Sequence, residues 1–166
     1  PKNDVDSSHL ERILTGGELL PVIQPEDADA IIVNTCGFIE QSQAESIAAV
    51  EELAAHKREG QTLIVAGCMT QLYGRQVREE HPAIDHVFGV GQWPEVARLL
   101  SVDVDAIFDI PESNVRVAGP SAYLKISDGC DAPCTFCVIP KIKGGLRSAP
   151  AGLLVKEAQR LVAAGA

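Results

Sequence analysis

Three cysteines in the second half of the sequence could hold a metal. Cys130, Cys134 and Cys137 stand at Cys-x-x-x-Cys-x-x-Cys spacing. Thiolates this close can point at one centre only from a loop that wraps around it, and Gly129 and Pro133 are typical of loops. Short cysteine spacings of this kind hold iron–sulfur clusters, whose irons are ligated by thiolates. A four-iron cluster would take three ligands from this loop, so its fourth iron would be free to bind another molecule.

Two other uses of these cysteines fit less well. A structural zinc site needs four closed ligands, and no fourth Cys or His lies near the loop. A disulfide framework calls for an even number of cysteines in a secreted protein. This chain has five cysteines, and we expect no secretory leader. The spacing therefore favours an iron–sulfur cluster, with zinc as the main alternative.

Two further cysteines each follow a short apolar run. Cys36 comes soon after residues 30–33, and Cys68 comes soon after residues 62–66. Such runs predict strands of a parallel sheet, whose carboxyl ends meet at one edge, where functional groups collect. A single cysteine of this kind is usually a small buried hydrophobe. Two at equivalent strand ends favour a shared metal site.

The alternation of strands with helices predicts an α/β fold. We expect strands at 28–34, 62–66, 86–90 and 122–126, and helices at 4–14, 41–58, 70–80, 93–100 and 150–164. Because successive strands are separated by helices, the sheet is expected to be parallel and covered on both faces. The predicted organisation is a three-layer N-terminal domain at 1–100, a linker at 101–120 with a small edge strand at 106–108, and a new unit at 121–166.

Charge and composition narrow the class of protein. The 166-residue chain has a formal net charge of −9, and its sequence shows no apolar run of membrane-spanning length. Residues 1–100 carry seven Lys and Arg against sixteen Asp and Glu, whereas residues 121–166 carry six against three. The acidic first part argues against broad contact with nucleic acid, which needs clustered cations. We expect a cytoplasmic protein with reduced thiols and no membrane partner.

The cysteine loop resembles that of the radical S-adenosylmethionine enzymes, in which an aromatic residue, here Phe136, precedes the last cysteine. The longer stretch 122–148 is similar to the methylthiotransferases of that superfamily, and most of all to their RimO-like branch. The resemblance implies that the open iron binds S-adenosylmethionine, which one electron cleaves to a radical. Phe136 would lie near the adenine, or simply pack against the loop. Residues 121–166 would begin a radical-SAM partial barrel with its first βα unit.

The resemblance also implies a second [4Fe-4S] cluster on the N-terminal domain, with Cys36 and Cys68 as two of its three protein ligands. The third family cysteine normally precedes the Pro-Lys-Asn that here begins at Pro1, so we expect this site to be empty or poorly occupied. The implied substrate is an aspartate of a small-subunit ribosomal protein, and an electron donor protein is a further partner. A tRNA adenosine methylthiotransferase and a non-catalytic metal-binding module remain alternatives.

The basic residues after the cysteine loop and the last helix allow two further expectations. Lys141, Lys143 and Arg147 could contact an anionic group or form a solvated turn. A single strand–helix unit leaves its strand edge and its apolar helix face uncovered. The residues expected at that helix face are Leu153, Leu154, Leu161 and Val162. Residues 121–166 should therefore be mobile, docked on the first domain or part of a barrel, and the chain alone should not turn over.

Overall fold

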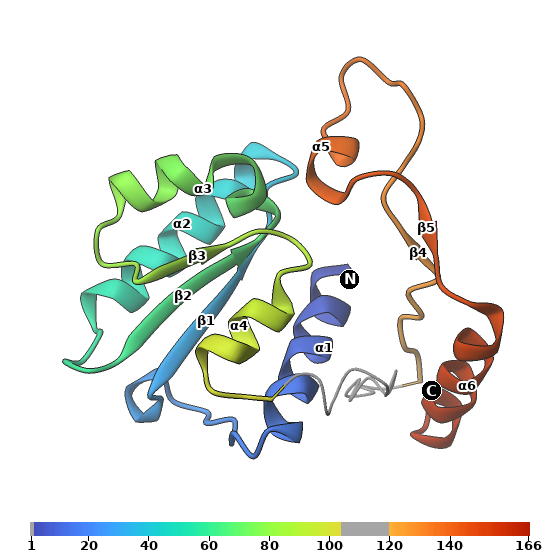
Figure 1. The fold of residues 1–166 in the computed structure, drawn as a ribbon, viewed down its shortest axis with the longest axis horizontal. Helices are drawn as coiled ribbons and strands as arrows, with labels where there is room; N and C mark the ends of the chain where they lie inside the picture. Colours follow the sequence, from blue (N-terminus) through green and yellow to red (C-terminus); the bar gives the residue numbers. More distant parts are fainter. Residues whose placement is uncertain (1, 104–119) are drawn as a thin grey trace.

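The computed structural model describes residues 2–103 and 120–166, with side chains from residue 5 onward. Residues 2–103, here called the α/β unit, form a three-stranded parallel sheet with helices on both faces (Figure 1). Its elements are α1 (Lys2–Gly16), η1 (Pro25–Asp27), β1 (Ala30–Thr35), α2 (Glu40–Ala55), β2 (Thr62–Gly67), α3 (Cys68–Glu80), β3 (His86–Phe88) and α4 (Trp93–Leu99). The predicted α/β class is confirmed.

The central strand β2 organises this unit. It pairs with β1 from Ala30↔Thr62 to Thr35↔Gly67 and with β3 on its other side, both in parallel. Parallel neighbours require crossover connections, and α2 and α3 supply them. Because the register of β1 and β2 runs to the ends of both strands, the residues that follow Thr35 and Gly67 emerge side by side.

Side chains of β2 alternate between two apolar cores, as a strand buried on both faces requires. Leu63 and Val65 pack with residues of α2 and α3, whereas Ile64 and Ala66 pack with residues of α1 and α4. All four of these side chains have no exposed surface. Figure 1 shows the resulting layers, with α2 and α3 over one face and α1 and α4 over the other. The predicted three-layer arrangement is therefore confirmed.

Residues 120–166, here called the C-terminal segment, contain four short elements. These are β4 (Ser127–Asp128), α5 (Ile139–Lys143), β5 (Arg147–Ser148) and α6 (Ala151–Ala163). β4 and β5 pair antiparallel and close the long loop between them at its base. The predicted helix at 150–164 is confirmed as α6, whereas the short helix α5 was not predicted. The edge strand expected at 106–108 lies outside the described residues.

The strand predicted at 122–126 is wrong. Residues 121–126 belong to no helix or strand, and pairing begins only at Ser127. Tyr123 and Ile126 are more than half exposed, so the apolar run is not covered as a buried strand would be. A strand exists only where a neighbour accepts its hydrogen bonds, and among the described residues the two of β5 are the partner available here. The apolar pattern could not reveal that lack of partners.

The apolar face of α6 is partly covered. Leu153 and Val162 are exposed, as expected, but Leu161 is buried, so the expectation that Leu161 would face water is wrong. None of the described helices is long and apolar enough to cross a membrane.

Candidate metal sites

Cys36 and Cys68 lie at one edge of the sheet, each one residue beyond the register pair Thr35↔Gly67. Both cysteines are free and partly buried. Cys68 is also the first residue of α3, because β2 ends at Gly67 and the helix follows without a loop between them. The structure therefore brings together the two strand-end cysteines that the sequence pattern paired.

The turn that carries Cys36 is held by α2. The backbone N–H of Cys36 donates to Ser46 Oγ over 3.1 Å, and the side chain of Gln43 donates to the Gly37 carbonyl over 3.0 Å. A Cβ on Gly37 would lie 2.6 Å from the Met69 Cα, so a residue without a side chain is required for the turn to pass the start of α3. Ser46 and Gln43 are positioning residues that the sequence pattern did not identify.

Gly67 sets the angle between β2 and Cys68. Its φ of 115° lies where L side chains are strained. A Cβ there would come within 2.6 Å of both the Asn34 side-chain oxygen and the Thr35 carbonyl oxygen. The close approach of the two strand ends thus depends on glycine at this position.

The thiol of Cys68 sits among charged groups from both parts of the chain. Burial raises its pKa, and the ammonium of Lys143 opposes that effect. The Cys36 thiol and the carboxylates of Asp6 and Asp128 raise the pKa further. Because Lys143 and Asp128 belong to the C-terminal segment, this segment lies close to the cysteine edge of the sheet. Packing of α5 against α3 brings it there.

The long loop between β4 and β5 is closed at its neck by hydrogen bonds from two backbone N–H groups. The Cys130 N–H donates to the Gly144 carbonyl over 3.1 Å, and the Leu146 N–H donates to Asp131 Oδ1 over 2.9 Å. Gly129 has a φ of 80°, and a Cβ there would meet the Gly145 carbonyl oxygen at 2.1 Å. The loop that carries the three cysteines is therefore pinned at its base. Glycine is required at position 129, where the two sides of the loop touch.

The three loop cysteines differ in exposure. Cys130 and Cys137 are partly buried, and Cys134 is exposed. The Cys130 sulfur accepts a hydrogen bond from the Ala132 N–H over 3.5 Å, and the Cys137 N–H donates to the Cys134 carbonyl over 3.2 Å, which forms a turn between those two cysteines. Phe136, at the tip of this turn, is 88% exposed.

The donor sets of the two sites suit iron–sulfur clusters in different degrees. Among the described residues, no three Cys, His, Asp or Glu side chains already converge on one point as metal ligands. The loop nevertheless offers three free thiols within eight residues, a pinned neck and a backbone N–H aimed at one sulfur. These features fit a cluster with three cysteine ligands, because hydrogen bonds to ligand sulfurs are part of such sites. The sheet edge offers two thiols, Cys36 and Cys68.

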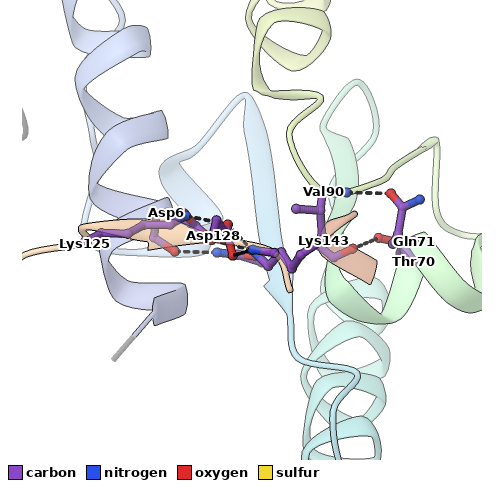
Figure 2. A network of polar contacts seen from close by, with 11 residues as sticks. Asp6, Thr70, Gln71, Val90, Lys125, Asp128 and Lys143 are labelled. Carbon is purple, nitrogen blue, oxygen red and sulfur yellow. Dashed lines mark hydrogen bonds and ion pairs between the residues drawn. The ribbon is translucent and has the colours of Figure 1, made fainter. Parts of the chain in front are cut away.

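Four charged residues join the α/β unit to the neck of the cysteine loop. Asp6 of α1 accepts from Lys125 over 2.6 Å and from Lys143 over 3.0 Å, each through a different oxygen. Asp128 pairs with the same two lysines, at 2.8 Å and 3.3 Å. Figure 2 shows Asp6, Lys125, Asp128 and Lys143 meeting as a closed ring of alternating charge. We call these four residues the ion-pair ring.

The ring is largely shielded from water. The side chains of Lys143 and Asp6 are 8% and 12% exposed. Burial alone would lower the pKa of Lys143, but the hydrogen bond and charge of Asp6, with the charges of Cys68 and Asp128, raise it overall. Burial would raise the pKa of Asp128, but the hydrogen bond and charge of Lys125 and the charge of Lys143 lower it. Both Lys143 and Asp128 are thus held in their charged forms.

The three basic residues that follow the cysteines have different environments. Lys143 is neither solvated nor free for an anionic ligand, because its ammonium is buried between two carboxylates. Lys141 and Arg147 are exposed. The sequence could have drawn attention to Asp128, because it stands two residues before Cys130. Nothing in the sequence around Asp6 indicated a partner more than a hundred residues away.

The start of α3 is fixed by a second set of polar contacts beside the ring. Thr70 donates its hydroxyl to the Phe88 carbonyl over 2.5 Å, and Gln71 accepts from the Val90 N–H over 3.0 Å (Figure 2). These contacts tie the end of β3 to the helix that begins at Cys68. The position of Cys68 is therefore defined from three sides: by β1, by β3 and by the C-terminal segment.

Comparison with known proteins identifies similar chains. Residues 1–89 match the family model described as "Uncharacterized protein family UPF0004". The ribosomal protein uS12 methylthiotransferase RimO of Anaeromyxobacter sp. (strain K) is 44% identical over 177 residues, which cover 99% of this chain and 38% of that protein. Proteins of the same name from Trichlorobacter lovleyi and Chloroflexus aurantiacus are 39% and 37% identical, over 99% of this chain and 40% and 42% of theirs. The chain thus spans about two fifths of these relatives' length.

Proposed function

This chain belongs to the UPF0004 family, and on that premise we propose that it forms the N-terminal and cluster-binding part of a radical S-adenosylmethionine methylthiotransferase. The proposed reaction adds a methylthio group to an aspartate of ribosomal protein uS12. The observation that carries the proposal is the pinned loop of three free cysteines, followed by α5, which packs against the helix α3 that begins at Cys68. The similarity to uS12 methylthiotransferases along 99% of this chain supports it.

The cysteine loop would hold the cluster that uses S-adenosylmethionine, with Cys130, Cys134 and Cys137 as ligands. A [4Fe-4S] cluster bound there would supply one electron to S-adenosylmethionine. The chain's own contribution is to hold the loop neck closed and to donate the Ala132 N–H to the Cys130 sulfur. The exposed ring of Phe136 is available to stack on a planar group such as adenine.

The α/β unit would hold the second cluster through Cys36 and Cys68, together with a ligand from outside this chain. We propose that residues 1–100 are the domain for this cluster and that residues 121–166 open the radical-SAM domain, with 101–120 between them. We also propose that an electron donor protein is a partner and that the protein acts in the cytoplasm. The acidic balance of residues 1–100 supports a protein substrate over a nucleic acid.

A chimaeric enzyme tests the reaction. This chain would replace the matched segment of the Anaeromyxobacter protein, and the anaerobically reconstituted, reduced chimaera would be incubated with S-adenosylmethionine and uS12. We expect uS12 to gain the mass of one SCH₃ group in place of hydrogen, and the same chimaera with Cys130→Ala to give no product. A chimaera that folds, binds iron and modifies tRNA instead of uS12 would contradict the proposed substrate.

The chain by itself should behave differently. Contacts to S-adenosylmethionine in the radical-SAM enzymes are spread over several barrel strands. We therefore expect that the reconstituted 166-residue chain does not cleave S-adenosylmethionine catalytically. The assay is release of 5′-deoxyadenosine after reduction. Multiple turnovers per chain would show that the further strands are dispensable.

A further inference from the structure

The ion-pair ring is the contact that joins the two cysteine-bearing parts through charge. Two of its members, Lys125 and Asp128, precede Cys130, Lys143 follows Cys137 at the end of α5, and Asp6 lies in α1. The ring therefore grips both ends of the cysteine loop and fastens them to one helix of the α/β unit. Apolar burial contributes little to the same attachment. Among the described residues after 119, the buried apolar side chains are Ile142 and Leu161.

We propose that the ring is a positioning device that holds the cysteine loop facing the Cys36 and Cys68 edge of the sheet, with Lys143 as its central residue. The proposal rests on the proposed function for its purpose, because two cluster sites that act on one substrate must be held at a fixed separation. It does not rest on that function for its structural content, which can be tested in the metal-free chain.

The arrangement of charges explains why Lys143 is central. Its ammonium bridges a carboxylate from each part of the chain, Asp6 and Asp128, and it is the least exposed member of the ring. Lys143 is also the last residue of α5, whose packing against α3 sets it near Cys68. A buried ion pair that loses one partner leaves the other charged and unsatisfied, which strongly favours opening of the contact.

Hydrogen exchange measures that opening where the structure places suitable reporters. The amides of Gly129, Cys130, Leu146 and Ala149 all donate hydrogen bonds at the loop neck. In the reduced, metal-free chain, Lys143→Met should speed exchange of these amides by about tenfold or more. Amides of the central strand β2 should keep their protection. Lys141→Met is the matched control, because Lys141 is an exposed lysine of the same helix, and it should leave all these rates unchanged.

A double-mutant cycle separates a ring from a set of independent contacts. The Asp6→Asn variant keeps both lysines of the ring but only one carboxylate, that of Asp128. The Lys143→Met variant keeps both carboxylates but only one lysine, Lys125. Together the two changes leave the balanced pair of Lys125 and Asp128. Residues in one charged network are not additive, so the double variant should exchange more slowly than the product of the two single effects predicts.

Alkylation of Cys68 provides a readout that ties the ring to the site. Lys143→Met and Asp6→Asn change the local charge in opposite directions. If the ring positions the segment over Cys68, both variants uncover the thiol, and both should be alkylated by iodoacetamide faster than the wild-type chain. If the ring acted on Cys68 through charge alone, the two rates would move in opposite directions.

The following results would overturn the proposal: equal exchange in Lys143→Met and Lys141→Met, multiplicative effects in the cycle, or opposite changes in Cys68 alkylation. Should Lys143→Met also deprotect β2, the near-isosteric Asp6→Asn decides the question by the same neck amides. Since every measurement uses the metal-free chain, failure of the wild-type chain to bind iron would remove the proposed function and leave this test standing.

Discussion

The α/β unit and the C-terminal segment both present cysteines, but they hold them by different means. In the α/β unit, Cys36 and Cys68 extend from paired strands whose central member is buried on both faces. In the C-terminal segment, the loop is held by backbone hydrogen bonds at its neck and by ion pairs to α1. The positions of Cys36 and Cys68 are therefore fixed by the fold of their own unit, whereas the position of the cysteine loop depends on a contact between the two parts of the chain.

The largest expected effect comes from the same truncation made in both regions. Leu63→Ala removes a side chain with no exposed surface from the centre of β2, and should lower the free energy of unfolding by about 3 kcal/mol. Leu153→Ala removes one that is 37% exposed on α6, and should cost less than about 1 kcal/mol. Urea unfolding followed by circular dichroism measures both. Equal losses would mean that the segment has an apolar core comparable with that of the sheet.

A smaller effect is expected at the glycine between the two strand ends. Gly67→Ala combines a strained positive φ with collisions against Asn34 and Thr35, and should cost about 2–3 kcal/mol. Gly60→Ala is the control, since Gly60 has a φ of 82° but open space around its Cβ position, and should cost about 1 kcal/mol. Thermal unfolding of the two variants gives the difference. Similar losses would show that the close approach at Gly67 can relax.

The smallest effect is expected at an ion pair inside the α/β unit. Asp85 pairs with Lys57 and accepts the Leu63 N–H over 2.7 Å. Burial acts to raise the pKa of Asp85, but those hydrogen bonds and the Lys57 charge bring it below its ordinary value of 3.8. Asp85→Asn should cost about 1 kcal/mol at pH 7, because the pair is partly exposed. This contrasts with Asp6→Asn, which should release the C-terminal segment.

The pH dependence of the Asp85 effect has a defined sign. A carboxylate whose pKa is lowered by folding adds stability above its unfolded pKa, and that stability is lost as pH falls through the lower folded value. The gap between wild type and Asp85→Asn should therefore be full at neutral pH and shrink below about pH 4. Unfolding curves from pH 3 to pH 7 test this, with the exposed Glu79→Gln as control. A gap that widens toward low pH would contradict it.

The sequence predicted those features that depend on local pattern. The run at 62–66 predicted a strand buried on both faces, and the similar run at 30–33 predicted a neighbouring strand that places Cys36 beside Cys68. Features that depend on pairing between distant residues could not be predicted. The run at 122–126 is apolar enough for a strand, but among the described residues it pairs with no other strand. The ion pair of Lys143 was not predicted, because its partner Asp6 lies in the first helix.

The most direct test of the central claim is the iron content of three reconstituted proteins. The claim is that the loop holds a cluster through its own three cysteines and that the sheet edge is a separate set of ligands. Wild type and the Cys36→Ala/Cys68→Ala variant should each bind about four iron atoms per chain with visible absorbance typical of a cluster. The variant with Cys130, Cys134 and Cys137 all changed to Ala should lose both. Unchanged iron and an unchanged spectrum in that triple variant would contradict the assignment.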